Sequence, residues 1–372
     1  MRKLAVIGLG FGDEGKGMVT SALVDRYLQE KEDVHKTIVT RFSGGHQAGH
    51  TVYVYDMNHV FANFGSGTLQ GVPSYWSRSC TVDPVGIVNE LKVLMKKVDN
   101  VKLFINKGCP VTTPYDKWRN QKSKSNLEHG TCGVGFGETI QREEDNYHLH
   151  FGDLFNHAAA KLKLKAIALR DMYYIDLSEY LEAVRFITTS KNIEAVDEIP
   201  EGYNTCIFEG SQGLLLDKDI GFFPHVTRSS VGMGGLAYRF EPIDEVYYVT
   251  RAYQTRHGNG PMTHEAELGL KQTAHESNEK HKYQGEFRTG FLDVDLLKYG
   301  LEKDRKEAGF SDHIKENLVI TCMDQIKTYM LIENGIAVRY KDSMTFVDAI
   351  RSTLKIESVH LSWSSNTEII KY

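Results

Sequence analysis

The sequence predicts an α/β fold with a mainly parallel central sheet flanked by helices. Short apolar segments of strand length alternate along the chain with longer segments of helical periodicity, which is the pattern of β-α-β units. Several of the short segments are continuously apolar, as strands covered by helices on both faces are. No segment has the composition of a linker, so we expect a single domain over residues 1–372 with loop and small subdomain insertions.

The expected elements follow from these two signals. Strands are predicted at residues 3–9, 37–42, 102–105, 204–208, 245–250, 317–321 and 358–362. Helices are predicted at residues 18–28, 85–98, 154–170, 294–302 and 345–354. The polar segment 112–126 and the charged segment 271–283 are expected to be surface loops.

The first element is the strand at residues 3–9, too short and too rich in branched side chains for a helix. It runs into residues 10–17, GFGDEGKG, and a helical pattern follows. In a strand, glycine-rich turn and helix, backbone N–H groups and the helix N-terminus can hold a phosphate, and a lysine can reach its outer oxygens. This start predicts a P-loop-like fold. A tight turn without a ligand is the alternative.

Residues 10–16 match the spacing of the phosphate-binding loop motif as far as Lys16. Gly17 stands where that motif has Ser or Thr, so the hydroxyl that normally holds Mg²⁺ is absent. A carboxylate in the loop, Asp13 or Glu14, is the expected replacement because Mg²⁺ prefers oxygen ligands. Acidic side chains beside phosphates are unfavourable unless they bind metal or move a proton, which favours chemistry here.

The predicted strand at 37–42 leads into a second loop, GGHQAGHT at residues 44–51. Its three glycines and two histidines indicate backbone close to a ligand. His46 and His50 have the spacing of zinc ligands on a helix. However, the glycines oppose a helix, and the glutamate of the zinc-protease motif is absent.

GDEGKG followed by RFSGGHQAGHTV resembles the adenylosuccinate synthetase family, whose patterns are close to GDEGKGK and GGHNAGHT. The likeness spans almost the whole chain. It implies a ligase that joins L-aspartate to IMP at the expense of GTP, with Mg²⁺ as cofactor and a homodimer as the assembly. It also implies that the 6-oxygen of IMP is phosphorylated first, with Asp13 accepting the N1 proton and His50 assisting the phosphoryl transfer.

The glycine-rich segment 129–137 and the GDLF at 152–155 resemble the family's loop for the nucleotide 5′-phosphate. Cys132 stands where the family has a threonine, so Thr131 or backbone amides are expected to hold the phosphate. The family also sends an arginine into the neighbouring subunit's site. That position is Asn146 here, and Arg142 is the nearest candidate.

FEGSQG at 208–213 and PHVT at 224–227 resemble family motifs whose glutamine and threonine contact the purine and the phosphate. A glutamine amide suits a purine edge because it donates and accepts in one plane. A buried glutamine that only anchors a loop is the alternative for Gln212.

AYQTRHGNGP at 252–261 follows the family closely, whereas the aspartate-binding loop departs from it. Of that loop's arginines only Arg288 remains, and Glu286 is new. A guanidinium is the natural partner of a carboxylate substrate. TCMD at 321–324 resembles TKLD, the guanine reader, and Asp324 favours GTP because a carboxylate accepts from guanine N1–H and its 2-amino group together. SWSS at 362–365 occupies the position of a family motif, STGPD, that lies beside the guanine.

The resemblance thus assigns the residues by role. For catalysis it implies Asp13, Lys16, His50 and Gln212. For GTP it implies Gly12, Asp13, Glu14, Gly15, Lys16, Gly17, Met18, Asp324, Ser362 and Ser364. For IMP it implies Asp13, Gln47, Ala48, Gly49, His50, Thr131, Cys132, Gln212 and Thr227. For L-aspartate it implies Gln284, Arg288 and Thr289, and for Mg²⁺ it implies Asp13 and Gly49.

Three alternatives stay open. A viral branch of the family makes 2-aminoadenine nucleotides from dGMP and aspartate with ATP or GTP. Its loop aspartate is typically a small residue, so the retained Asp13 favours IMP. A GTP-dependent switch protein would explain the first loop and Asp324, but not Gln212 and Thr227. An inactive relative is disfavoured because Asp13, Lys16 and His50 are intact.

Composition limits the partners and the compartment. Hydrophobic content of 41% and charged content of 25% are those of a soluble globular protein. The net charge of -5 gives no electrostatic case for nucleic acid. No segment approaches the roughly 20 apolar residues that cross a bilayer, so no membrane partner is expected. Five scattered cysteines indicate reduced thiols, and we expect a cytoplasmic protein.

Overall fold

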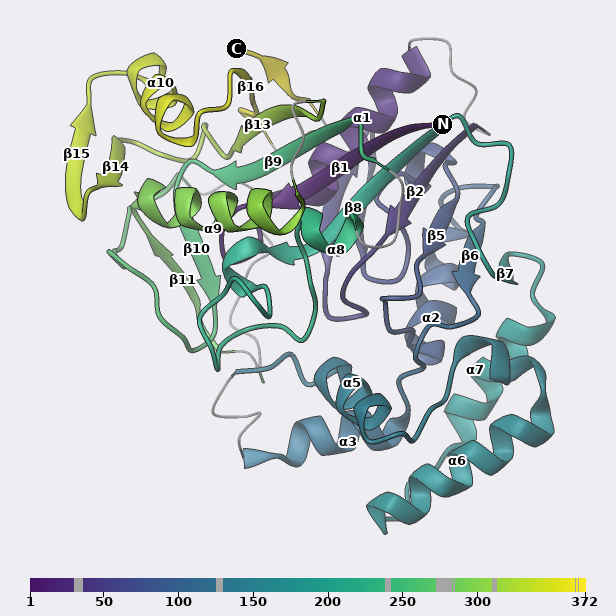
Figure 1. The fold of residues 1–372 in the computed structure, drawn as a ribbon. Coiled ribbons are helices and arrows are strands. Elements are labelled where there is room, and N and C mark those ends of the chain that lie inside the picture. The colour runs from purple at the N-terminus through teal and green to yellow at the C-terminus, as the bar shows by residue number, and fades with distance from the viewer. Residues whose placement is uncertain are drawn as a thin grey trace.

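The computed structural model describes residues 1–29, 36–124, 130–237, 242–271, 283, 285–309, 313–364, 366 and 368–372. Its centre is a sheet that has, among these residues, ten strands in the order β17-β16-β13-β9-β1-β8-β2-β5-β6-β7. Every neighbouring pair in it is parallel except β16 and β17. Helices lie on both sides of it (Figure 1). The predicted α/β fold with a mainly parallel sheet is confirmed.

The elements have the following bounds. The central strands are β1 (Arg2–Gly8), β2 (Thr37–Arg41), β5 (Ser74–Trp76), β6 (Leu103–Asn106), β7 (Ile193–Val196), β8 (Thr205–Gly213), β9 (Glu245–Arg251), β13 (Lys315–Thr321), β16 (Ser358–Leu361) and β17 (Ile370–Lys371). The smaller ladders are β3 (His50–Val54) with β4 (Met57–Phe61), β10 (Gln254–His257) with β11 (Phe287–Gly290), and β12 (Leu292–Asp293) with β14 (Tyr329–Glu333) and β15 (Ile336–Tyr340). The α-helices are α1 (Lys16–Gln29), α2 (Pro84–Leu94), α3 (Pro114–Lys122), α5 (Phe136–Glu144), α6 (His157–Asp171), α7 (Ser178–Thr189), α8 (Met233–Ala237), α9 (Val294–Glu307) and α10 (Ser343–Leu354).

Strand β1 forms the middle of the core because both of its faces are covered. Leu4 and Val6 belong to the apolar cluster that includes buried side chains of α1, whereas Ala5 and Ile7 belong to the cluster that includes those of α9. This alternation is the period of two of a strand. Full burial of a leucine, valine or isoleucine side chain contributes about 1.5–3 kcal/mol. The burial fixes β1, and with it the loop that follows.

Several boundaries differ from the predictions for identifiable reasons. The segment 112–126 is not a loop: it contains α3, which Thr113 caps through a hydrogen bond from Asp116 N. Helix α6 begins at His157, because Asn156 is its N-cap, and a short 3-10 helix precedes it. Helix α2 ends at Leu94, four residues before the predicted end. The predicted loop 271–283 lies almost entirely outside the described residues.

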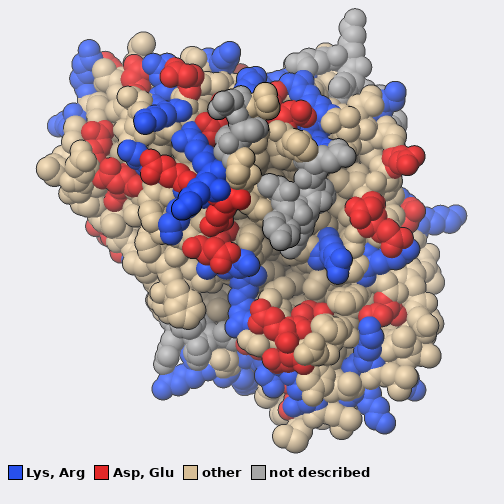
Figure 2. Space-filling model, viewed as in Figure 1, with Lys and Arg blue, Asp and Glu red and all other residues tan. Residues whose placement is uncertain are grey.

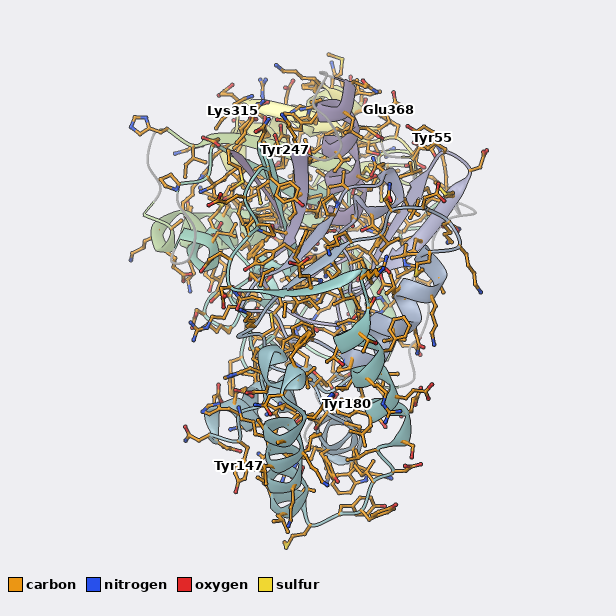
Figure 3. All side chains as sticks on the ribbon, turned by 90° about the vertical axis from the view of Figure 1, so that its right-hand side faces the viewer. Tyr55, Tyr147, Tyr180, Tyr247, Lys315 and Glu368 are labelled. Carbon is orange, nitrogen blue, oxygen red and sulfur yellow. The ribbon has the colours of Figure 1, made fainter. Side chains whose placement is uncertain are left out.

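The helices α3, α5, α6 and α7 form one end of the molecule, away from the C-terminal edge of the sheet (Figure 1). In the turned view, Tyr147 and Tyr180 lie at this helical end, and Lys315 and Glu368 lie at the other (Figure 3). Basic and acidic side chains are interspersed on the face shown in Figure 2. None of the described helices has the length and apolar character of a membrane span.

Candidate active site

The loop between β1 and α1 is closed around one of its own side chains. The Glu14 carboxylate accepts hydrogen bonds from Gly10 N at 3.1 Å and Gly12 N at 2.9 Å. Its other oxygen lies 2.5 Å from Lys16 Nζ, and both side chains are buried. Two backbone donors and an ammonium group therefore converge on one anion, as they do on a phosphate in such loops.

Glycines make this arrangement possible. A Cβ atom at Gly8 would lie 2.4 Å from Glu14 Oε2, and one at Gly213 would lie 2.2 Å from Glu14 Oε1. The cavity lined by Gly10, Gly12 and Glu14 measures only about 10 Å³. The anion cradle of the loop is thus filled by the carboxylate of Glu14.

Asp13 points elsewhere than Glu14. Its φ of 60° lies in the left-handed region, which few non-glycine residues adopt and which clusters at functional sites. Its carboxylate, 27% exposed, lies 3.5 Å from Nε2 of His257 on β10. Burial and the charge of Asp13 together raise the pKa of the Cys132 thiol to about 11. Asp13 therefore faces a space bordered by β10 and the second glycine-rich loop.

His50 stands at the start of β3 and is held by a buried glutamate of β8. Its Nδ1 lies 2.5 Å from Glu209 Oε1 and 3.4 Å from Arg41 Nη1. Burial and the Arg41 charge lower the pKa of His50, against the opposing effect of Glu209. Burial raises the pKa of Glu209, but His50 and Arg41 outweigh it and lower that pKa to about 2. The carboxylate is ionised and fixes Nδ1–H as its donor.

His50 also lies against the phosphate loop. A Cβ atom at Gly17 would come within 2.7 Å of His50 Cβ and 2.9 Å of Ser66 Oγ. Ser66 N donates to Glu209 at 3.0 Å. The first turn of α1, His50 and Glu209 are therefore packed together, and Gly17 in that turn follows Asp13 by four residues in the chain.

In the 44–51 loop, the Gln47 amide is buried, and neither of its atoms has a hydrogen-bond partner among the described residues. A buried amide without partners costs roughly 1–3 kcal/mol, so it indicates a place for a ligand. Ala48 O accepts from Arg41 Nη2 at 3.1 Å, and Gly49 is exposed.

The second glycine-rich loop is held by α3. Asn120 donates to Thr131 Oγ1 at 2.8 Å and accepts from Gly135 N at 3.1 Å. Thr131 and Cys132 are half-buried. Helix α3, which lies in the predicted loop 112–126, thus supports the second glycine-rich loop.

Gln212 lies in β8, and Thr227 follows that strand in the chain. Strand β8 carries extra residues between its pairings with Val6 and Gly8, and Gln212 lies in this irregularity. A Cβ atom at Gly12 would lie 3.0 Å from Gln212 Oε1, which places this amide beside the phosphate loop. Thr227 N donates to Leu216 O at 2.7 Å.

A cavity of about 410 Å³ is lined in part by basic side chains, and one of them belongs to Arg228, which follows Thr227 in the chain. Arg78, Lys218 and Arg228 contribute to its wall, together with three serines, and no acidic side chain is among the lining residues. Such a lining suits an anionic group.

Asp324 and the predicted serines gather at the ends of β13 and β16. Met323 N donates to Ser362 O at 3.2 Å, and Ser362 Oγ donates to Ser364 O at 2.9 Å. Burial raises the pKa of Asp324, against an opposing effect of Lys271. Thr321 Oγ1 donates to Glu14 O at 2.8 Å, which joins this strand end to the phosphate loop. A Cβ atom at Gly15 would lie 3.3 Å from Thr321 Cγ2, whereas Met18 is buried in α1.

The predicted aspartate-binding arginine is already paired. Arg288 holds both oxygens of Glu265, at 2.9 and 2.6 Å, and also donates to Gly258 O at 3.0 Å and Gly260 O at 2.9 Å. Thr289 Oγ1 donates to Ala266 O at 3.0 Å. Gln284 lies outside the described residues. A carboxylate ligand at Arg288 would have to replace Glu265.

Three side chains at the site were missed by sequence reasoning. Glu209 and Arg41 flank His50, and His257 faces Asp13. Glu209 had a signal, because a glutamate inside a continuously apolar strand is buried and must have a partner. His257 had no such signal in the sequence, since its contact with Asp13 depends on how β10 packs against the loop between β1 and α1.

The fold is that of an α/β protein with a mainly parallel sheet, whose first strand leads into a glycine-rich loop that holds an anion. A family model described as adenylosuccinate synthetase matches residues 5–363. The chain is 29% identical over 333 residues to adenylosuccinate synthetase of Thermoplasma volcanium, covering 82% of this chain and 73% of that protein. It is 31% identical over 331 residues to that of Pasteurella multocida, covering 81% and 74%.

Solved structures agree on the fold. The fully ligated adenylosuccinate synthetase of Plasmodium falciparum matches with a TM-score of 0.77 at 19% identity, over 100% of both chains. The succinoaminodeoxyadenylate synthetase of cyanophage S-2L, bound to dGMP and dATP, matches with a TM-score of 0.68 at 15% identity, over 100% of this chain and 95% of that one. The chain belongs to the adenylosuccinate synthetase family. It is therefore a ligase of purine biosynthesis that forms a C–N bond, and the family uses GTP as co-substrate.

Proposed function

We propose that this chain joins L-aspartate to IMP in two steps, driven by GTP through a 6-phosphoryl intermediate, and releases adenylosuccinate, GDP and phosphate. The observation that carries the proposal is the convergence of Gly10 N, Gly12 N and Lys16 Nζ on one anion, beside the buried His50–Glu209 pair. It supports a site where a phosphoryl group is held and transferred next to a proton donor.

In the first step Asp13 accepts the N1 proton of IMP, and the electron pair moves to the 6-oxygen. That oxygen attacks the γ-phosphorus of GTP, the bond to the β-γ bridging oxygen breaks, and GDP leaves. Lys16 and the loop amides compensate the charge on the moving phosphoryl group. His50, oriented by Glu209, donates through Nε2 to an oxygen of that group.

In the second step the amine of L-aspartate attacks C6, and the phosphorylated oxygen leaves as inorganic phosphate. As the C–N bond forms, the amine nitrogen loses a proton to solvent. The N1 proton stays on Asp13 after the first step and passes to solvent when the product leaves, which restores the carboxylate. The 6-oxygen of IMP therefore ends in phosphate. Arg288 is the candidate for the aspartate carboxylate, provided that it exchanges Glu265 for the substrate.

The donor set fits Mg²⁺. Asp13 offers a partly exposed carboxylate and Gly49 an exposed backbone, and both supply oxygen, which Mg²⁺ prefers. When bound there, the ion would neutralise charge on the phosphates of GTP. The Gln47 amide and the cation-lined cavity beside Thr227 are the proposed contacts of the IMP base edge and phosphate.

The acceptor dGMP, to which the cyanophage relative is bound, differs from IMP by a 2-amino group and a missing 2′-hydroxyl. Asp13 occupies the loop position where a small residue would leave room for that amino group, so IMP is the proposed acceptor. A cytoplasmic homodimer completes the proposal. None of the five cysteines, all of which the structure describes, forms a disulfide bond, which supports a reducing compartment.

The test is an incubation with Mg²⁺ and L-aspartate that varies IMP against dGMP and GTP against ATP. Mass spectrometry identifies the product, and IMP labelled with ¹⁸O at C6 is expected to give labelled phosphate. GTP hydrolysis that needs neither purine nor aspartate would favour a switch protein instead. Product formation with unlabelled phosphate would overturn the intermediate, and a product only from dGMP would overturn the choice of IMP.

A further inference from the structure

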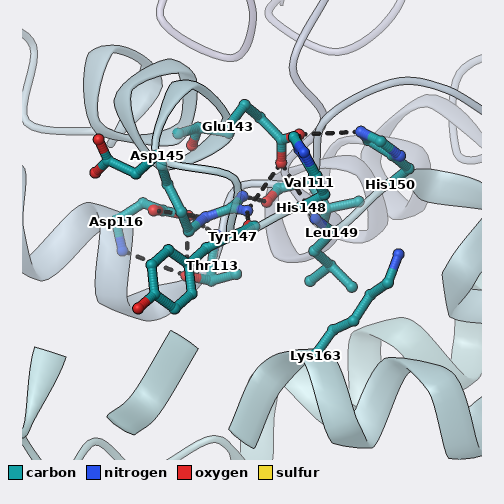
Figure 4. Close-up of polar contacts among 12 residues, drawn as sticks. Val111, Thr113, Asp116, Glu143, Asp145, Tyr147, His148, Leu149, His150 and Lys163 are labelled. Carbon is teal, nitrogen blue, oxygen red and sulfur yellow. Dashed lines mark hydrogen bonds and ion pairs between the residues drawn. The ribbon is translucent and has the colours of Figure 1, made fainter. Parts of the chain in front are cut away.

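Two histidines and a glutamate form a cluster at the C-terminal end of α5 and in the segment that follows it (Figure 4). Oε2 of Glu143 lies 2.7 Å from Nδ1 of His148 and 3.0 Å from Nε2 of His150. All three ligand atoms lie within 4.8 Å of one another. No residue of the proposed reaction belongs to this cluster.

The carboxylate of Glu143 is anchored through its other oxygen. Oε1 accepts from Arg142 Nη1 at 2.9 Å and from Leu149 N at 3.1 Å, so Oε2 is left to face the two imidazoles. Arg142 is itself completely buried and paired with Asp116 at 3.0 Å. Because Asp116 balances the arginine charge, the Glu143 carboxylate is a fixed ligand with its negative charge available. Anchoring of this kind orients ligands in protein metal sites.

The two histidines are placed on one face by the backbone. Leu149 between them is fully buried, whereas 46% of the His148 side chain and 38% of the His150 side chain are exposed. In an extended segment, residues two apart point to the same side. The imidazole rings stack with centroids 5.6 Å apart. Both rings thus face solvent next to Oε2, from which an ion can enter.

The spacing of the ligand atoms suits a small transition-metal ion. Ligands at about 2.0–2.1 Å in a tetrahedral zinc site are about 3.3 Å from one another. The two O–N separations, 2.7 and 3.0 Å, reach that value through small side-chain rotations. The ordinary alternative is an exposed ion pair, which would contribute at most about 1 kcal/mol. An ion pair with Glu143 requires only one histidine, whereas here the imidazoles of His148 and His150 both contact Oε2 of Glu143.

We propose that Glu143, His148 and His150 form a surface site for a late first-row divalent metal, with Zn²⁺ as its preferred ion and water as the fourth ligand. Two imidazole nitrogens and one carboxylate form a donor set for zinc, not for Mg²⁺ or Ca²⁺, which take oxygen. The metal ties the C-terminus of α5 to residues 148–150. Since α5 begins at Phe136, within the last residues of the second glycine-rich loop, the site stabilises the helix that follows that loop.

The test uses the full-length protein freed of metal by a chelator. Calorimetric titration with Zn²⁺ is expected to give one ion per chain at about 1–10 µM or tighter. Co²⁺ is expected to give visible absorption bands of a low-coordinate nitrogen–oxygen site. His148→Gln and His150→Gln should each weaken Zn²⁺ binding at least tenfold, and the double variant at least a hundredfold. Zn²⁺ should raise the melting temperature of the native protein but not that of the double variant.

The control is His313→Gln, which removes an exposed imidazole elsewhere and should leave Zn²⁺ binding unchanged. Excess Mg²⁺ should not displace the Zn²⁺. Equal Zn²⁺ binding by the native protein and the double variant would overturn the proposal, as would binding only at millimolar concentration. Each histidine lies on the surface, so the single variants test the site even if the double variant folds poorly.

Discussion

The contact between His50 and Glu209 offers the sharpest test of the proposed chemistry. Both side chains are buried, and Nδ1 and Oε1 are 2.5 Å apart. Replacing Glu209 with Gln keeps a hydrogen-bond acceptor of the same shape but removes the negative charge. The proposed donor role requires protonated His50. Glu209 favours that form, whereas burial and the charges of Arg41 and Lys16 oppose it.

The expected loss can be bounded from this geometry. Removal of one partner of a buried ion pair typically costs about 3–5 kcal/mol, because the other group is left uncompensated. This cost refers to folding stability; where about 3 kcal/mol of it falls on the protonated His50 of the transition state, turnover falls about a hundredfold. The sign of the pH effect follows as well. Without the anion the pKa of His50 falls further, so the protonated form is lost earlier and the alkaline limb of the turnover profile moves to lower pH.

The assay is steady-state product formation over a pH series, with GTP binding measured separately to confirm that the variant is folded. Glu90→Gln is the matched control, since Glu90 is also buried and contacts His59 Nε2 at 3.3 Å, outside the proposed reaction. It should lose stability without a shift of the pH profile. Turnover of the Glu209 variant within threefold of native, with an unmoved alkaline limb, would refute the donor role of His50.

Four further predictions rest on single contacts. Asp13→Asn and His50→Asn should each lose at least about a hundredfold in turnover while GTP binding persists; near-normal turnover removes that residue from the mechanism. Asp324→Asn should reduce the preference for GTP over ATP at least tenfold, measured as the ratio of kcat/KM values; an unchanged ratio excludes it as the guanine reader. Gly17→Ala should lower the melting temperature and the turnover, because its Cβ would lie 2.7 Å from that of His50; a silent variant contradicts this packing. Burial raises the pKa of Asp304 to about 7, so the native state binds the proton more tightly than the unfolded chain, and the free energy of unfolding falls as pH rises from about 4 to 7. Asp304→Asn should therefore raise the melting temperature more at pH 8 than at pH 4.5. An equal shift at both pH values would refute the raised pKa of Asp304.

The parts of the fold that sequence reasoning found are those with local signals. Strand β1, the glycine-rich loop and α1 follow one another within thirty residues, and each has its own pattern. Strand β5 is three residues long and has no period to detect. Helix α3 was missed because it is polar, yet its capping box of Thr113 and Asp116 with Pro114 between them is present in the sequence. The capping residues at the start of α3 are stronger evidence for a helix than its polar composition is for a loop.

The site divides in the same way. Asp13, Lys16 and His50 stand in two neighbouring motifs, so the sequence alone brings them to one region. The partner of His50 comes from 159 residues further along, and only the pairing of β2 with β8 brings them together. The Glu143, His148 and His150 cluster was not singled out either. Its His-x-His spacing is common, and the glutamate becomes its neighbour only because α5 ends where it does.

The position of Glu14 explains why the loop carries two acidic residues. Without an anion, the amides of Gly10 and Gly12 and the buried Lys16 would be unpaired, at a cost of roughly 1–3 kcal/mol for each buried donor and more for the charge. Glu14 removes that cost in the free protein. Any phosphate that enters must displace this carboxylate, so the stability gained by the free loop is subtracted from the affinity for the nucleotide. Asp13, turned away by its left-handed backbone, does not take part in this pairing and is the residue proposed to contact the acceptor. The two neighbouring carboxylates thus have different partners: Glu14 pairs with the donors of the loop, whereas Asp13 lies beside His257, where the reaction is proposed.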